Sequence, residues 1–120
     1  MRLFLCDDNE QYRMLAKRAL ERGGHTVIGE AGNGQEALDQ APEASPDVLL
    51  LDLNMPVMTG FQALPELRAS LPETQIIILT TGQAPAERDQ ALNAGADAFL
   101  VKPDRIMMLS GELDAVLRDG

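Results

Sequence analysis

Five short hydrophobic runs recur along the chain, each separated from the next by a more polar segment. The runs are LFLC (3–6), TVIG (26–29), VLLL (48–51), IIIL (76–79) and AFLV (98–101). None alternates cleanly between apolar and polar residues, a pattern typical of strands buried on both faces of a parallel sheet. Their spacing of about 22 to 28 residues leaves room for one helix in each crossover.

The segments between the runs carry the periodicity and the end signals of helices. Over residues 10–22, Leu15, Ala19 and Arg22 form one stripe, and a Gly-Gly pair follows. Asn33 can cap a second helix. The last helix repeats apolar residues on one face, namely Ile106, Leu109, Leu113 and Val116.

Two prolines bear on the remaining helices. Pro85 suits the first turn of the fourth helix, whereas Pro65 lies where the third helix should run. Because proline lacks a backbone donor and clashes with the preceding turn, we expect the third helix to be kinked or to start late.

Strand and helix alternate throughout, which predicts an α/β fold of the (βα)5 type. This is a doubly wound, open, five-stranded parallel sheet with helices on both faces. The length of 120 residues fits one domain, which we place over residues 1–120. Ligands of such folds bind beyond the carboxyl ends of the strands, so the residues that follow each run are the functional candidates.

Composition narrows the range of partners. The 19 acidic residues exceed the 10 basic ones and give a net charge of −9, which argues against direct binding of nucleic acid or of an anionic membrane. No apolar run approaches the roughly 18 residues of a membrane span, and acidic residues come too early for a signal peptide. Cys6 is the only cysteine, which excludes an internal disulfide. We therefore expect a cytoplasmic protein.

Reactive side chains follow four of the five runs. Asp7 and Asp8 follow the first, Asp52 the third, Thr80 the fourth and Lys102 the fifth. At an effective dielectric constant of about 20, two carboxylates about 4 Å apart repel by about 4 kcal/mol. A divalent cation would hold the three together, and oxygen ligands favour Mg²⁺. A carboxylate beside Mg²⁺, a lysine and a threonine suits transfer of a phosphoryl group onto that carboxylate.

Four motifs at these positions carry a resemblance to a known family. They are DD after the first run, DLNMPVMTG (52–60) after the third, LT (79–80) after the fourth and FLVKP (99–103) after the fifth. In this order and spacing, the chain resembles the CheY-like receiver domains of two-component response regulators over essentially its whole length. The resemblance implies a flavodoxin-like sheet with strand order 2-1-3-4-5, and a signalling protein that is not a turnover enzyme.

The resemblance also implies a role for each residue of the motifs. Asp52 would be the phosphoacceptor and would share Mg²⁺ with Asp8, which binds the metal directly. Asp7 would assist through a water molecule, and Asn54 would offer its backbone carbonyl to the metal. Lys102 would pair with the phosphoryl group.

Further implications concern the switch and the partners. Thr80 would move toward the phosphoryl oxygens, and the ring of Phe99 would turn inward into the vacated space. The Lys102–Pro103 bond would be cis. The phosphodonor would be a histidine kinase or a phosphotransfer protein, and an output protein or domain would dock on residues 84–118. Phosphorylation could also drive homodimer formation.

Two other functions stay open. A protein of this fold could act as an interaction module that works without phosphorylation. A phosphatase with an aspartyl-phosphate intermediate would need a second acid two residues after the nucleophile, where this chain has Asn54. A P-loop enzyme is excluded because the chain has no GxxxxGK[ST] motif.

The sequence predicts no functional role for four other residues. His25 follows a Gly-Gly pair and is expected in an exposed turn. Cys6 is expected to be a buried small apolar residue on the first strand. Met107 and Met108 are expected only to pack.

Overall fold

The computed structural model describes residues 1–81 and 85–119, in which strands and helices alternate. The strands are β1 (Arg2–Cys6), β2 (Thr26–Ala31), β3 (Val48–Leu51), β4 (Gln75–Thr80) and β5 (Ala98–Val101). The helices are α1 (Glu10–Arg22), α2 (Gly34–Ala44), α3 (Gly60–Ser70), α4 (Pro85–Asn93) and α5 (Leu109–Asp119), with a 3₁₀ turn, η1 (Ile106–Met108), before α5. Each hydrophobic run is a strand, as predicted. Within the described ranges, no helix is both long and apolar enough to cross a membrane.

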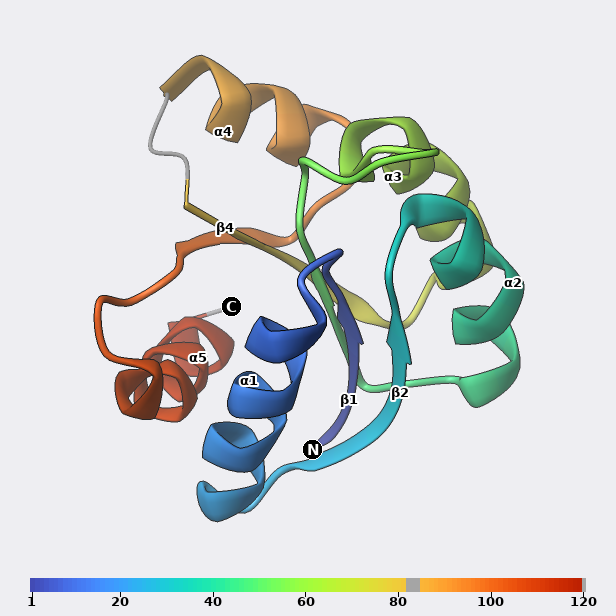
Figure 1. The fold of residues 1–120 in the computed structure, drawn as a ribbon. Coiled ribbons are helices and arrows are strands. Elements are labelled where there is room, and N and C mark those ends of the chain that lie inside the picture. The colour runs from blue at the N-terminus through green and yellow to red at the C-terminus, as the bar shows by residue number, and fades with distance from the viewer. Residues whose placement is uncertain (82–84, 120) are drawn as a thin grey trace.

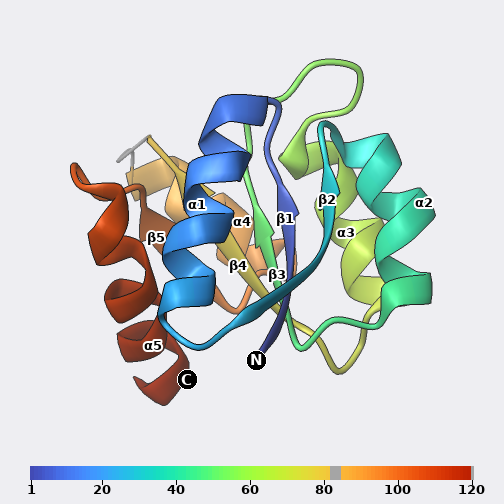
Figure 2. The same cartoon turned by 60° about the horizontal axis from the view of Figure 1, so that its bottom comes forward.

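The strands form one parallel sheet in the order β2-β1-β3-β4-β5, which confirms the predicted topology (Figure 1). The direction in which strands are added reverses between β1 and β3. The carboxyl ends of the strands lie along one edge, the upper edge in Figure 2. A ligand site is therefore expected at this edge, beside the ends of β1 and β3.

Helices cover both faces of the sheet. α1 and α5 pack on one face, and α2, α3 and α4 pack on the other (Figure 1). Successive residues of β1 show the division, since Leu3 and Leu5 face α1 and α5, whereas Phe4 and Cys6 face the other three helices. The central strands β1, β3 and β4 are thus buried on both sides, which explains their apolar sequences without alternation.

The buried face of α1 differs from the predicted stripe. Ala16 and Leu20 are buried and Tyr12 packs against the same cluster, whereas Leu15 is 40% exposed. The three inward residues are spaced four apart, which is a second helical phase available to this segment. The cluster that buries this phase combines residues of the sheet with Leu109 and Leu113 of α5, which lie too far along the chain for local periodicity to reveal them.

α3 begins at Gly60 and does not start late. The Thr59 hydroxyl accepts the Gln62 N–H at 3.2 Å, and the Gln62 side chain accepts the Thr59 N–H at 2.9 Å. This capping box satisfies two donors at the helix start and fixes it upstream of Pro65, which lies inside the helix.

Three side chains lie elsewhere than predicted. His25 is buried, not exposed, and its Nε2 lies 2.8 Å from Oδ1 of Asp114 in α5. Met107 and Met108 on η1 are 72% and 54% exposed, so packing within the domain does not account for them. The turn at His25 is covered by α5, whereas η1 leaves its two methionines in solvent.

Candidate functional site

The hydrogen bonds of the sheet continue one residue past three strands and place three of the predicted site residues. The Asp7 N–H donates to the last carbonyl of β2 at 3.0 Å, the Asp52 N–H to the last carbonyl of β1 at 2.9 Å, and the Lys102 N–H to the last carbonyl of β4 at 2.8 Å. Each residue follows a buried leucine of the α1/α5 face by two positions. Strand periodicity therefore directs all three side chains to that face.

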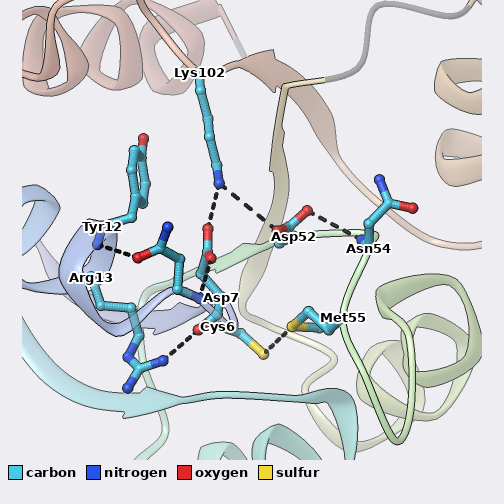
Figure 3. Close-up of polar contacts among 9 residues, drawn as sticks. Cys6, Asp7, Tyr12, Arg13, Asp52, Asn54, Met55 and Lys102 are labelled. Atoms are coloured by element: carbon cyan, nitrogen blue, oxygen red, sulfur yellow. Dashed lines mark hydrogen bonds and ion pairs between the residues drawn. The ribbon is translucent and has the colours of Figure 1, made fainter.

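Lys102 lies between the two buried carboxylates (Figure 3). Its Nζ is 2.5 Å from Oδ2 of Asp7 and 3.8 Å from Oδ2 of Asp52. The three side chains are shielded from solvent, with exposed fractions of 13% for Lys102, 8% for Asp7 and 10% for Asp52. Water screens these charges weakly, so the ammonium strongly influences both carboxylates.

The second oxygen of each carboxylate is held by a backbone amide. The Asn9 N–H donates to Oδ1 of Asp7 at 2.9 Å, and the Asn54 N–H donates to Oδ1 of Asp52 at 3.2 Å. In both cases the donor lies two residues after the acceptor, the short-range bond that aspartates form at turns. The two Oδ2 atoms are thereby left to face the ammonium.

The surroundings of Asp52 disfavour the negative charge of its carboxylate. Burial raises the pKa of Asp52, and the Asp7 and Asp8 carboxylates act in the same direction, while the Asn54 amide and Lys102 lower it. Desolvation is the largest of these influences. A group that adds positive charge at the site would therefore stabilise the ionised form of Asp52.

Three carboxylates are close enough to share one cation. Asp7, Asp8 and Asp52 each offer an oxygen, and these atoms all lie within 4.8 Å of one another. Asp8 is exposed, whereas the other two are buried, so the opening to solvent lies on the side of Asp8. An all-oxygen donor set with one open side suits Mg²⁺, which keeps several of its waters. The Asn54 side chain is turned away from the Asp7 and Asp52 carboxylates in Figure 3, which leaves only its backbone to contribute.

Thr80 and Phe99 lie on the same face of the sheet. Thr80 is buried at the end of β4 and pairs with Val101, while the half-buried Phe99 pairs with Ile78, two residues before Thr80. Residues paired in a parallel sheet, and residues two apart on a strand, share a face. Phe99 accordingly packs against the cluster on the α2/α3/α4 side. This placement is compatible with the predicted switch pair, which stays a prediction.

The Lys102–Pro103 bond is trans, so the expected cis bond is wrong. The two isomers of such a bond differ by only about 0.5–1 kcal/mol, which lets the surrounding structure decide between them. Here the bond of the Lys102 N–H to β4 and the contacts of its ammonium are all made with the trans isomer.

Two residues of α1 belong to the site and were missed from the sequence. The Lys102 Nζ lies 4.1 Å from the centroid of the Tyr12 ring, and Arg13 Nη1 donates to the Asp7 backbone carbonyl at 2.5 Å. Arg13 also pairs with Glu30 of β2 at 3.1 Å. The spacing of four residues between Tyr12 and Ala16 was the sequence signal that could have placed Tyr12 on the inward face of α1.

The sequence has close relatives among signalling proteins. The family profile described as response regulator receiver domain matches residues 3–113. The chemotaxis protein CheY of Thermotoga maritima is 36% identical over 85% of this chain and 85% of the relative. The response regulator MprA of Mycobacterium avium is 36% identical over 98% of this chain but only 51% of the relative, so the chain spans about half the length of MprA.

Solved structures agree with these matches. The response regulator domain of Thermotoga maritima CheB superposes with a TM-score of 0.87 at 29% identity, covering 99% of this chain and 94% of that one. The chemotaxis protein CheY4 of Vibrio cholerae superposes with a TM-score of 0.85 at 34% identity, covering 96% and 97%. The chain therefore belongs to the response regulator receiver domain family of two-component signalling.

Proposed function

We propose that this domain accepts a phosphoryl group on Asp52 and changes conformation in response. The observation that carries the proposal is the position of the Asp52 carboxylate, which is buried, 3.8 Å from the Lys102 ammonium and close to two further carboxylates. We propose that the receiver domain spans residues 1–120 and that the protein is located in the cytoplasm. Its relatives are signalling proteins, and we propose that it catalyses only its own phosphorylation and dephosphorylation.

The transfer needs few groups from the protein. An oxygen of the Asp52 carboxylate attacks phosphorus while the bond from phosphorus to the donor atom breaks, and the donor leaves with the bonding electrons. The donor is the phosphohistidine of a kinase or of a phosphotransfer protein, or a small acyl phosphate. Lys102 can pair with the incoming phosphoryl oxygens from its present place, and the Thr80 hydroxyl can donate to a further oxygen.

Magnesium and phosphoaspartate are general features of the receiver family, and the acidic cluster fits this metal. Asp8 and Asp52 would bind Mg²⁺ directly, Asp7 would assist through water, and the Asn54 backbone carbonyl would complete the protein ligands. When bound, the metal would neutralise negative charge on the transferred phosphoryl group. The Asp7 carboxylate bonds the Lys102 ammonium at 2.5 Å. With Mg²⁺ bound, it would interact both with this ammonium and with a water molecule of the metal.

The response would pass from the site to the last two helices. Thr80 ends β4, the strand between β3 and β5, and Phe99 of β5 lies on the same face of the sheet as Thr80. When Thr80 turns toward the phosphoryl group, the Phe99 ring can enter the space that it leaves. This movement shifts the population between two conformations that present different surfaces. The output partner would then dock on residues 84–118, of which residue 84 lies outside the described part.

Exposed apolar side chains support a docking role for this region. Met107 and Met108 on η1 are mostly in solvent. Met107 also lines a groove of about 230 Å³ between α1 and η1, together with Leu15, Arg18, Ala19, Arg22 and Ile106. Such contiguous apolar surface is a common mark of interaction sites. A second phosphorylated copy of the chain is a further candidate partner.

Intact mass spectrometry tests the central proposal. The protein is incubated with Mg²⁺ and acetyl phosphate, and Asp52→Asn is compared with Asp104→Asn, which changes the same charge at an exposed residue. The wild type and Asp104→Asn should gain a phosphoryl adduct, whereas Asp52→Asn should gain none. Absence of the adduct on the wild type, or an undiminished adduct on Asp52→Asn, would contradict the proposal. Partner binding that ignores both Mg²⁺ and Asp52→Asn would instead favour a phosphorylation-independent module.

A further inference from the structure

The face of an aromatic ring lies against the ammonium of Lys102. Its Nζ is 4.1 Å from the centroid of Tyr12, and Figure 3 shows the ring alongside the end of the lysine side chain. Tyr12 is held in the first turn of α1, where its N–H donates to the Asn9 side chain at 3.0 Å. The ring packs against the apolar cluster under α1 and α5, and this packing holds the ring beside Lys102.

The ammonium therefore has neighbours on three sides. Asp7 Oδ2 lies at 2.5 Å, Asp52 Oδ2 at 3.8 Å and the Tyr12 ring at 4.1 Å. Lysine carries its charge on a flexible four-carbon chain, which gives little intrinsic control over where the charge lies. A ring face attracts a cation, and the attraction increases when the cation is shielded from water, as the Lys102 ammonium is here.

The hydroxyl of Tyr12 does not explain why an aromatic residue is used. It is buried and has no hydrogen-bond partner among the described residues. Burial and the nearby Asp7 and Asp52 carboxylates raise the pKa of Tyr12, so the phenol stays neutral at physiological pH. An unpartnered buried hydroxyl contributes no stabilising hydrogen bond. The part of Tyr12 that acts on the site is thus its ring.

We propose that Tyr12 is a positioning residue for Lys102. Its ring confines the ammonium to the space between Asp7 and Asp52, from which Lys102 can meet a phosphoryl group on Asp52 without a large movement. The role in phosphorylation rests on the function proposed above. The contact itself does not, and it can be tested on the unphosphorylated protein.

Nuclear magnetic resonance of the lysine side chains tests the contact. The chain has two lysines, Lys17 and Lys102, so selective ¹³C-lysine labelling gives one internal control on α1. A nucleus above a ring face is shifted upfield by the ring current. The Lys102 ε-methylene should therefore resonate upfield of that of Lys17 in the wild type and in Tyr12→Phe, and return to the Lys17 position in Tyr12→Leu.

Kinetics test the consequence. With acetyl phosphate and Mg²⁺, Tyr12→Leu should be phosphorylated about three- to tenfold more slowly than the wild type, while Tyr12→Phe keeps the wild-type rate. A wild type that shows no upfield Lys102 signal would overturn the contact. Equal rates for all three proteins, with the ring shift present, would overturn the positioning role.

Two results separate this inference from the proposed function. If the wild type is not phosphorylated, the proposed function fails, yet the Lys102 shift still decides whether the ring holds the ammonium. If Tyr12→Leu does not fold, as judged from its amide spectrum, the comparison of Lys102 with Lys17 in the wild type and in Tyr12→Phe decides the contact alone.

Discussion

The ammonium of Lys102 bonds the carboxylate of Asp7 at 2.5 Å, so a cation of the protein already occupies one side of the acidic cluster. Lys102 should therefore affect the binding of Mg²⁺ at this cluster in two opposite ways. It reduces the repulsion among the carboxylates, and it also competes for one of them. The balance between these effects can be measured.

Lys102→Met should bind Mg²⁺ about three- to tenfold more tightly than the wild type, because loss of the ammonium frees Asp7 and leaves more negative charge at the site. Isothermal titration calorimetry at fixed ionic strength measures this affinity. Arg105→Met is the matched control, since it removes the same charge from an exposed residue. If the two variants bind Mg²⁺ equally, the competition does not exist.

Asp52→Asn should stabilise the protein near neutral pH. Burial raises the pKa of Asp52 in the folded state above its ordinary value of 3.8, so the folded state binds this proton more tightly than the unfolded state does. By linkage, this residue makes stability fall as pH rises from about 3.8 through the folded-state pKa. At pH 7 the variant should gain about 1 kcal/mol, allowing for partial solvent screening.

Urea unfolding at several pH values checks this sign. The advantage of Asp52→Asn should shrink as the pH falls toward 3.8 and disappear below it, where Asp52 of the wild type is protonated in both states. Asp104→Asn, which removes the same charge from an exposed residue, is the control. A constant advantage across this range would mean that the buried charge is not its cause.

Gly60→Ala should destabilise the fold although Gly60 is the first residue of a helix. A Cβ there would lie 2.2 Å from the backbone oxygen of Asp52, which cannot move without disturbing the end of β3. We expect a loss of about 1–3 kcal/mol. Gly111→Ala is the control, because a Cβ at this position of α5 meets no described atom within 4 Å, and it should stabilise by about 0.5–1 kcal/mol. Thermal melting of both variants measures the contrast, and equal effects would refute it.

Cys6 should not react with a thiol reagent in the native protein at pH 8. Burial, helped by the Asp7 and Asp52 carboxylates, raises the pKa of Cys6 to about 12, so almost no thiolate is present. Ellman's reagent should report no fast thiol in the native state and one per chain in urea. Fast labelling of the folded protein would show that the end of β1 is open to solvent.

The fold was predictable because burial on both faces leaves a local signature in the sequence. VLLL at residues 48–51 reads as a central strand without knowledge of its neighbours. The site was predictable in outline for a topological reason, since the ends of parallel strands meet at one edge. Asp7, Asp52 and Lys102 were therefore expected at the same edge of the sheet once the strands were identified, and the structure brings them together there.

What escaped prediction depends on contacts between distant segments. His25 is buried because Asp114, 89 residues further along, covers it with α5. Tyr12 belongs to the site because α1 packs with one of two possible phases, and the choice is made by its neighbours. The trans bond before Pro103 reflects a small energy difference that no local pattern reveals.

The ion pair between Lys102 and Asp7 joins residues 95 positions apart, which directly follow β5 and β1, two strands separated in the sheet by β3 and β4. A chain that has folded only as far as β4 holds both aspartates but has no ammonium to set against them. The last strand must dock before the acidic edge acquires its counter-charge. The Asp52 carboxylate therefore gains its neighbouring ammonium only when the whole sheet is complete.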